Sequence, residues 1–347
     1  MKIDIFCHVT PPRYLKAFQK KVSPEIADSL PTKGIPTLLD LEARFRVMDH
    51  YGGMVQVLTL TNPPVESVFE PDDALEMARI ANDEMAELVA KHPDRFIAAV
   101  ACLPMNDMDA ALREADRAID ELHLKGVQLY TNILGKELDS PEFFPLFERM
   151  AQHDLPIWIH PFFQSVGKNV GAVAKDKDQF DQYRVFTAEK NQAWALDRSV
   201  FGMPAGTNTA VTRLVYSGLF DALPDIKLIT HHCGGSIPYF ANRIEMHYLM
   251  FGQQKDDRLG LEKPVLDYFK MVYGDSALHG NVAGLMCGYD FFGAEHMLFG
   301  TDMPFGAESG LWSVRRTIES VERMDITPSE RALIFEGNAR RLLRLAA

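Results

Sequence analysis

The sequence has few cysteines and no long apolar run. Its four cysteines, Cys7, Cys102, Cys233 and Cys287, form no CxxC pair and lie in or beside apolar stretches, so we expect reduced, buried thiols and no disulfide framework. No apolar stretch approaches the roughly 18 to 20 residues that cross a bilayer. The chain also begins directly with an apolar, strand-like run. Together these features predict a cytoplasmic protein.

Positive charge is also in deficit. The chain has 36 Lys and Arg against 48 Asp and Glu, a formal net charge of −12. Its long-range field therefore repels nucleic acid and anionic membranes, and we expect a small-molecule partner instead. An anionic substrate needs local cationic groups to counter this background, which draws attention to individual arginines.

Short apolar runs alternate with longer amphipathic stretches along the chain. Strands that alternate with helical patterns are typical of βαβ units, and near-continuous apolar strands are typical of parallel sheets covered on both faces. Eight such units predict an α/β fold, a (β/α)8 TIM barrel, built as a single domain over residues 1–347. The runs are residues 3–7, 55–60, 96–103, 126–129, 156–159, 227–230, 271–273 and 297–300.

The connection after the fifth run is much longer than one helix requires. It spans residues 161–226, and its first part, residues 166–177, is rich in Gly, Lys and Asp. In a barrel this segment leaves the C-terminal rim, where long loops tend to be functional. We therefore predict a long insertion after strand 5 that serves as a lid or a dimer arm.

Histidines and one aspartate fall at the ends of the predicted strands. His8 follows the first run, His160 closes the fifth, His231 and His232 close the sixth, and Asp302 closes the eighth. Taken alone, any one histidine is more often a hydrogen-bonded structural residue. The shared position at strand C-termini instead predicts a site for zinc or a similar ion, with an open position for water or substrate.

With these motifs the chain resembles the amidohydrolase-2 branch of the amidohydrolase superfamily, the group of aminocarboxymuconate semialdehyde decarboxylase and the resorcylate-type decarboxylases. The resemblance implies a metal-dependent, cofactor-free decarboxylase of a small aromatic or conjugated carboxylic acid, a lyase that acts as a homodimer. The matching stretches occur in family order at residues 1–11, 155–161, 223–238, 274–277 and 299–305.

The resemblance also implies a ligand set. The first strand of the family carries His-x-His or Glu-x-His, because residues two apart on a strand point to one face. Here Phe6 takes the first of these positions and cannot bind a metal, which leaves His8, His160 and Asp302 as expected ligands of zinc or, alternatively, manganese. In a regular strand Cys7 points away from the site, whereas a bulge would turn it inward.

The family motif of histidine, any residue and glycine, ending at a later proline, matches His232, Gly234 and Pro238. His232 is therefore the expected acid/base, together with Asp302, because an imidazole near its reference pKa exchanges protons at neutral pH. The adjacent His231 is then expected to face the other side of the strand, against a helix.

Two arginines match family positions that hold a substrate carboxylate. Arg44 lies five residues before Asp49, and Arg243, eleven residues after His232, matches an arginine that a neighbouring subunit supplies. Guanidinium groups bind carboxylates in bidentate fashion, which suits an acidic substrate. The alternative for each is a helix-borne arginine that makes only a surface salt bridge.

Two other functions stay open. Related barrels also carry out hydrolysis or hydration with a metal-bound water, because fold does not determine function. A non-catalytic binding paralogue that lost its metal together with the first ligand is the second alternative. Release of CO2, incorporation of water and the metal content of the purified protein distinguish the three.

Overall fold

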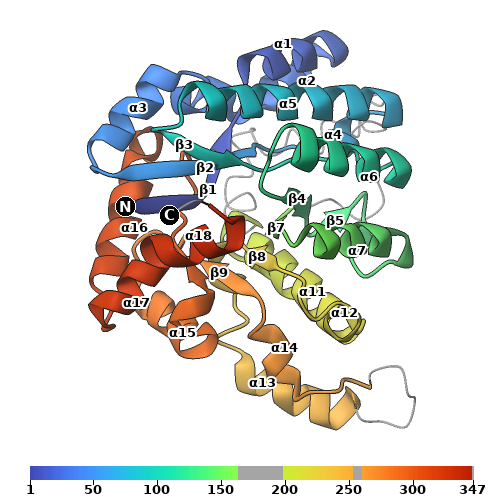
Figure 1. The fold of residues 1–347 in the computed structure, drawn as a ribbon, viewed down its shortest axis with the longest axis vertical. Coiled ribbons are helices and arrows are strands. Elements are labelled where there is room, and N and C mark those ends of the chain that lie inside the picture. The colour runs from blue at the N-terminus through green and yellow to red at the C-terminus, as the bar shows by residue number, and fades with distance from the viewer. Residues whose placement is uncertain (163–197, 253–259, 346–347) are drawn as a thin grey trace.

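The structure is a computed structural model that describes residues 1–162, 198–252 and 260–345. Strands β1, β2 and β3 form one parallel sheet, and β10, β9, β8, β7 and β4 form a second. Parallel bridges from Cys7 to Met303 and from Ala101 to Val127 join the two sheets at both edges. The result is the closed, eight-stranded parallel barrel that the sequence predicts (Figure 1). Its strands are β1 (Lys2–Val9), β2 (Met54–Leu60), β3 (Phe96–Ala99), β4 (Val127–Tyr130), β7 (Ile157–His160), β8 (Leu228–Thr230), β9 (Tyr273–Asp275) and β10 (Met297–Leu298).

Each predicted apolar run overlaps one barrel strand, and only the seventh is clearly displaced. The run at residues 271–273 was expected to be the strand, but β9 begins at Tyr273. Met271 instead donates its backbone N–H to the carbonyl of Tyr268, closing the turn that follows α14 (Val265–Phe269). Apolar character alone does not separate the end of a buried helix from the start of a buried strand.

Helices surround the barrel on its outside (Figure 1). The longest of the described helices, α5 (Pro71–Lys91), starts with a proline at its first position and has Asp72 and Asp73 in its first turn, where negative charge interacts favourably with the helix dipole. Within residues 1–162, 198–252 and 260–345, the other outer helices of eight or more residues are α1 (Pro12–Lys21), α3 (Leu41–Asp49), α6 (Met108–Asp116), α7 (Phe144–His153), α11 (Met203–Tyr216), α15 (Val282–Phe292) and α16 (Leu311–Glu322).

The barrel interior forms its own small hydrophobic cluster. Trp158 of β7 lies in it and donates its indole N–H to the carbonyl of Ile5, 3.0 Å away. Leu342 and Leu343 of α18 (Asn338–Leu343) belong to the same cluster, so this last helix packs against the barrel interior. A larger cluster fills the layer between strands and outer helices.

A bulge in β1 determines which of its side chains face the interior. Asp4 pairs with Gln56 and Cys7 with Leu58, so three steps on β1 oppose two on β2. The extra residue shifts the inward positions from odd to even numbers, and Phe6 joins the interior cluster. Cys7 lies in the outer layer, as expected, because the bulge precedes it.

Much of the long insertion after β7 lies outside the described residues, including the stretch 166–177 expected to act as a lid or dimer arm. The described part contains η6 (Arg198–Gly202), α11 and α12 (Leu219–Ala222), which lead into β8. The role of residues 166–177, and the expectation that residues 1–347 form one domain, stay predictions.

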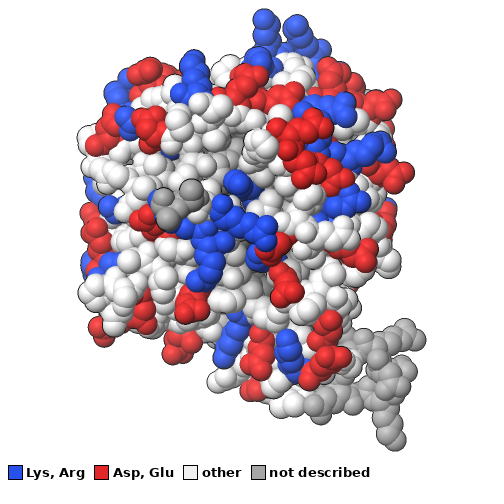
Figure 2. All heavy atoms as spheres, in the orientation of Figure 1, with Lys and Arg blue, Asp and Glu red and all other residues white. Residues whose placement is uncertain are grey.

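Acidic and basic side chains are interspersed over the face shown in Figure 2, with Lys and Arg gathered beside the C-terminal end of the chain. Arg340 and Arg344 of this region are paired with Glu336 and Asp154. The excess of acidic residues therefore does not give this face a uniform negative charge. None of the described helices combines the length and apolar character needed to cross a bilayer.

Candidate metal centre

Three histidines from three strands meet at one end of the barrel. His8 lies in β1, His160 ends β7, and His231 directly follows β8. One nitrogen of each ring lies within 4.8 Å of the others, and all three side chains are buried. This end is the C-terminal rim of the strands, where barrel enzymes carry their catalytic groups.

Hydrogen bonds orient the rings of His8 and His160. The Nδ1 atom of His160 donates to the carbonyl of Pro161, 2.8 Å away. The hydroxyl of Thr59 donates to the carbonyl of Cys7 at 3.1 Å and therefore accepts from Nδ1 of His8, 3.0 Å away. Both rings consequently present the lone pair of Nε2 to the shared space, which is how metal-binding histidines are held.

His231 is oriented by a buried carboxylate. Its Nδ1 atom is hydrogen-bonded to Asp275 at the end of β9. The other oxygen of Asp275 accepts from the backbone N–H groups of Cys233 and Ala277, each at 3.0 Å. With both oxygens engaged, Asp275 fixes the imidazole so that Nε2 points toward Asp302, 3.1 Å away.

The expectation that His231 faces a helix on the other side of its strand is therefore wrong. Ile229, two residues earlier, belongs to the interior cluster, and the alternation of a strand gives His231 the same orientation. The adjacent His232 also reaches the site, because its φ of 55° turns the chain at the end of the strand. Both histidines thus lie near Asp302.

Asp302 connects the histidines. Its Oδ1 atom lies 3.2 Å from Nε2 of His8 and 3.1 Å from Nε2 of His231, and its Oδ2 atom lies 3.8 Å from Nε2 of His232. The contact with His8 lacks hydrogen-bond geometry, so this buried nitrogen has no hydrogen-bond partner among the described residues. A lone pair facing a carboxylate in this way is suited to a divalent cation between them, and the residues fit such an ion.

His279, which follows β9, also lies near Asp302 and was not predicted as a site residue. Its Nε2 atom lies 4.0 Å from Oδ2 of Asp302, and its ring centroid lies 6.4 Å from that of His232. His232, His279 and Asp302 all have a positive φ, which is costly for residues other than glycine and is concentrated at functional sites. Such strain leaves no pattern in the sequence.

Burial and neighbouring charge keep two of the imidazoles neutral. Burial lowers the pKa of His8, and the nearby Asp302 only partly opposes this. Burial, together with repulsion from His8 and His231, holds the pKa of His160 well below its usual value. Neutral imidazole is the form that binds a metal.

The pKa values of the adjacent residues His231 and His232 are shifted in opposite directions. Burial alone would lower the pKa of His231, but the carboxylates of Asp275 and Asp302 raise it to about 10. Burial, and then repulsion from His231, lower the pKa of His232. Burial favours the neutral form of Asp302, but His231 holds its pKa well below the usual range. The site therefore strongly favours positive charge at His231.

Arg44 lies in the outer layer of the barrel. Its side chain is fully buried, its Nε atom donates to Gln56 at 2.7 Å, and its Nη1 atom donates to the carbonyls of His8 and Thr37 at 2.7 and 3.3 Å. It also lies over the ring of Phe96, in the outer cluster. These contacts support a role in holding β1 against α3 and do not favour the expected contact with a substrate carboxylate.

Arg243 is exposed on α13 (Ala241–His247), remote in the fold from Arg44 (Figure 1). Large apolar side chains are exposed in the same part of the sequence, before α13, on α13 and on the following turn η8 (Tyr248–Gly252). They are Tyr239, Phe240, Met246, Leu249, Met250 and Phe251, with 44 to 77% of each side chain exposed, and we call them the α13 patch. An apolar patch of this kind marks an interaction surface.

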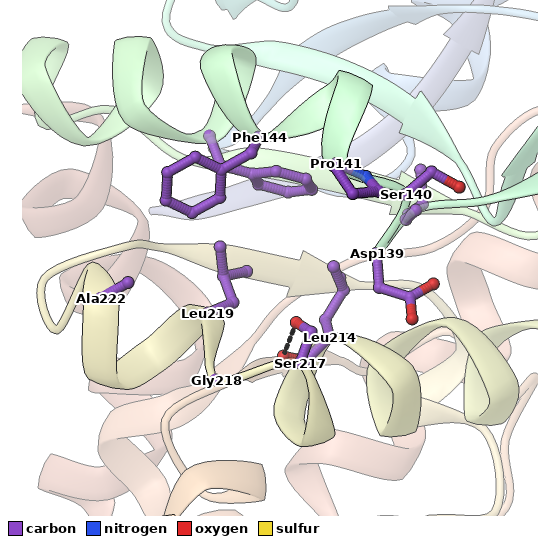
Figure 3. Close-up of a pocket in the computed structure, with 11 residues that line it drawn as sticks. Asp139, Ser140, Pro141, Phe144, Leu214, Ser217, Gly218, Leu219 and Ala222 are labelled. Carbon is purple, nitrogen blue, oxygen red and sulfur yellow. Dashed lines mark hydrogen bonds between the residues drawn. The ribbon is translucent and has the colours of Figure 1, made fainter. Parts of the chain in front are cut away.

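A separate hollow of about 340 Å³ lies between α7 and the α11–α12 pair (Figure 3). Phe144, Leu214 and Leu219 line it, and Asp139 lies at its edge. None of the histidines described above borders it, so it is distinct from the candidate metal centre.

Comparison with known proteins identifies the family of the chain. The amidohydrolase family model matches residues 3–345. A 2-amino-3-carboxymuconate-6-semialdehyde decarboxylase of Dictyostelium discoideum is 32% identical over 295 residues, covering 84% of this chain and 73% of the relative. A gamma-resorcylate decarboxylase of Polaromonas sp. is 29% identical over 317 residues, covering 89% of each.

A solved structure extends the comparison to the fold. The crystal structure of a dihydroxybenzoic acid decarboxylase from Polaromonas sp., with bound manganese and the inhibitor 2-nitroresorcinol, has a TM-score of 0.76 and 26% identity, covering 99% of this chain and 97% of that one. These matches confirm the family resemblance and the barrel that the sequence predicts.

Proposed function

Because this chain belongs to the amidohydrolase family, we propose that it is a metal-dependent, cofactor-free decarboxylase of a small aromatic or conjugated carboxylic acid. Such an enzyme is a carbon–carbon lyase, and the relatives named as decarboxylases support this assignment. The observation that carries the metal dependence is the convergence of ring nitrogens of His8, His160 and His231 within 4.8 Å.

We propose His8, His160 and Asp302 as metal ligands, as the sequence predicts. His231 joins them, because its Nε2 atom faces the same space and Phe6 supplies no ligand. Asp275 and Asp302, which favour an imidazolium at His231, equally favour a metal cation in place of its proton. When bound, the cation acts as a Lewis acid and template for the substrate's oxygens. Zinc is the proposed ion, with manganese as the alternative.

His232 is the proposed acid/base. Burial lowers its pKa, so its protonated ring is a stronger acid than a free imidazolium, and its Nε2 atom lies 3.8 Å from Oδ2 of Asp302. In the reaction the bond between the substrate carbon and its carboxylate breaks, CO2 leaves, and the electron pair stays on carbon. The proton of His232 then forms the new C–H bond. Solvent reprotonates the ring, whose side chain is 17% exposed.

The α13 patch is proposed to pack against a second copy of this chain. Six exposed large apolar side chains within residues 239–251 are costly in a monomer, and a homodimer would remove them from water. Arg243 lies on α13, between members of this patch in the sequence, and would be delivered to the partner's site, where it would bind the substrate carboxylate. Its exposed position in one copy is consistent with that role.

Measurement of product tests the proposed reaction. The metal-loaded protein, incubated with hydroxybenzoates and muconate-type acids, is expected to release CO2 and one equivalent of decarboxylated product. Incorporation of oxygen from labelled water without CO2 would support hydrolysis or hydration instead. Less than about a tenth of an equivalent of bound metal in freshly purified protein would support a non-catalytic paralogue.

A further inference from the structure

The turn after β8 has a backbone conformation that side chains rarely adopt. Four successive residues, from His232 to Gly235, have φ values of 55°, 55°, 74° and 66°. The first two, His232 and Cys233, are not glycines, and a positive φ is costly for them. Such a conformation persists only where its surroundings hold it. We call residues 232–235 the β8 turn.

The β8 turn is linked to His231 through one backbone hydrogen bond. The N–H of Cys233 donates to Oδ1 of Asp275 at 3.0 Å, and Oδ2 of the same carboxylate accepts from Nδ1 of His231. A displacement of the turn would therefore release one oxygen of Asp275 and loosen the imidazole that the other oxygen orients. His232, the proposed acid/base, is itself the first residue of the turn. The placement of the turn thus determines where both histidines lie.

Helix α15 packs on the β8 turn and on β9 from the outer layer of the barrel. The helix has a glycine where it meets the turn. A Cβ atom at Gly288 would lie 2.3 Å from Sγ of Cys233, far closer than packed atoms approach one another. Glycine inside a helix is destabilising relative to alanine, so its presence at this buried position requires a reason. The sulfur occupies the space that an alanine side chain would need.

A second residue of α15 packs against the same backbone. Phe292 lies one helical turn after Gly288, and its ring is 2.9 Å from the place that a Cβ atom at Gly234 would take. A Cβ atom at Gly274 of β9 would lie 3.0 Å from the same ring. The ring therefore lies directly on the backbone of the β8 turn and of the neighbouring strand. Gly288 and Phe292 together give α15 a surface that matches the turn.

The thiol of Cys233 is suited to packing and not to chemistry. Burial, and then the charge of Asp275, raises the pKa of the thiol, so the thiol stays neutral. A neutral, buried cysteine behaves as a small apolar side chain. Cys233 is 3% exposed and belongs to the cluster between strands and outer helices, where close packing opposes rotation of the sulfur out of the contact.

We propose that α15 positions the two histidines after β8 by receiving the sulfur of Cys233 in the space that Gly288 leaves. The contact holds the β8 turn in its conformation and keeps the N–H of Cys233 on Asp275, which fixes the imidazole of His231. Gly288 and Cys233 are thus positioning residues, because they act on the reaction only through the histidines. The inference rests on the proposed function for its effect on turnover, whereas the contact itself can be tested without turnover.

Gly288→Ala in the full-length, zinc-loaded protein tests this inference. The added methyl group should displace the sulfur and the turn, so kcat for CO2 release is expected to fall about tenfold or more, and KM should change less than kcat. The proton on Nδ1 of His231 is bonded to a buried carboxylate and gives a 1H NMR signal downfield of the backbone amides. In Gly288→Ala this signal should shift or broaden.

Rescue by a second substitution separates the contact from a general effect on the helix. Cys233→Ala removes the sulfur and makes room for the methyl group of Gly288→Ala. The double variant should regain the NMR signal, and its kcat should lie within about threefold of that of Cys233→Ala alone. Gly288→Ala combined with Cys287→Ala removes the neighbouring sulfur of α15 instead and should stay impaired.

Gly52→Ala is the matched control, because no described atom beyond its chain neighbours lies within 4 Å of the added methyl group. It should keep the parent kcat and NMR signal. The inference is overturned if Gly288→Ala also keeps both, as when the thiol simply rotates, or if Cys233→Ala restores neither.

Folding of each variant is assessed by circular dichroism. If Gly288→Ala does not fold, recovery of the fold in the double variant with Cys233→Ala supports the contact, and an unfolded double variant overturns it. Absence of CO2 release by the parent protein would instead contradict the proposed decarboxylation, and it leaves the NMR comparison valid.

Discussion

The ring of Phe6 lies flat against the imidazole of His231, with centroids 4.0 Å apart and planes inclined by 17°. The side chain that takes the place of a family ligand thus packs directly on a histidine that faces the same space. We expect His231→Ala to weaken metal binding at least tenfold, and Phe6→His in that background to restore much of the affinity. Competition with a chelator measures the affinity for zinc and manganese.

The control for this exchange is Phe6→Leu combined with His231→Ala, which should not regain affinity. His232→Ala serves as the neighbouring control and is expected to change affinity less than about threefold. Unaltered metal binding in His231→Ala would exclude this histidine as a ligand.

Asp275 determines the orientation of His231. We therefore expect it to affect activity or metal affinity without contacting the substrate. Asp275→Asn removes the charge that holds Nδ1, so we expect activity or metal affinity to fall about 10- to 100-fold. The CO2 release rate and the bound metal per chain are the measurements. Asp290→Asn, which changes an exposed carboxylate on α15, should match the parent protein. If Asp275→Asn and Asp290→Asn changed CO2 release and bound metal equally, Asp275 would have no role in the site.

The buried Glu66 should make stability depend on pH. Burial raises its pKa from 4.5 to about 8, so the folded state holds a proton that the unfolded chain releases between these values. Its contribution to the free energy of unfolding is therefore complete below pH 4.5 and is lost as the pH rises through 8. Urea unfolding from pH 5 to 8.5 should show a steeper loss for the parent than for Glu66→Gln. Parallel curves for the two proteins would contradict the shift, and Glu42→Gln is the exposed control.

Arg44 is expected to act on stability and not on substrate affinity. Arg44→Met leaves the carbonyl of His8 and the amide oxygen of Gln56 without a donor, which should lower the free energy of unfolding by about 3 kcal/mol. Denaturant unfolding measures this loss, and KM for an active substrate should stay within about twofold. Arg46→Met, at an exposed position of the same helix, is the control. A raised KM with unchanged stability would restore Arg44 as a carboxylate ligand.

The α13 patch predicts a homodimer, and a charged side chain introduced into the patch should disrupt it. Leu249→Glu or Phe251→Glu should convert the protein to a monomer in light scattering at micromolar concentration, because an unpaired carboxylate is costly to bury. Lys16→Glu adds the same side chain at an exposed site on α1 and should leave the dimer intact. If the parent is already monomeric, the proposed interface is wrong.

The barrel could be predicted because each of its strands overlaps an apolar run in the sequence. His8, His160 and Asp302 all follow such runs, and parallel strands bring their C-terminal ends to one rim. Adjacent His231 and His232 could not be separated in this way. Strands that are buried on both faces are apolar throughout, so their sequence does not show which face points inward.

The parts that the sequence did not reveal depend on contacts between distant residues. Asp275 acquires its role only when β9 is paired with β8, and His279 reaches Asp302 only through a backbone with positive φ. The placement of Arg44 depends on the outer layer, because a helix-borne arginine has the same sequence context whether it binds substrate or packs beneath a strand. Local pattern carries no signal for any of these.

The single extra residue in β1 has a consequence for any attempt to rebuild this centre. Deleting Ile5 or Phe6 would remove the bulge but keep Cys7 opposite Leu58, so the imidazole of His8 would still face the barrel mouth. If the bulge were lost with every residue retained, the alternation set by Ile3 and Ile5 would instead bring the thiol of Cys7 into the barrel mouth and bury the imidazole of His8 against the helices. Whether this strand offers nitrogen or sulfur to a metal is thus decided by the bulge as much as by its residues.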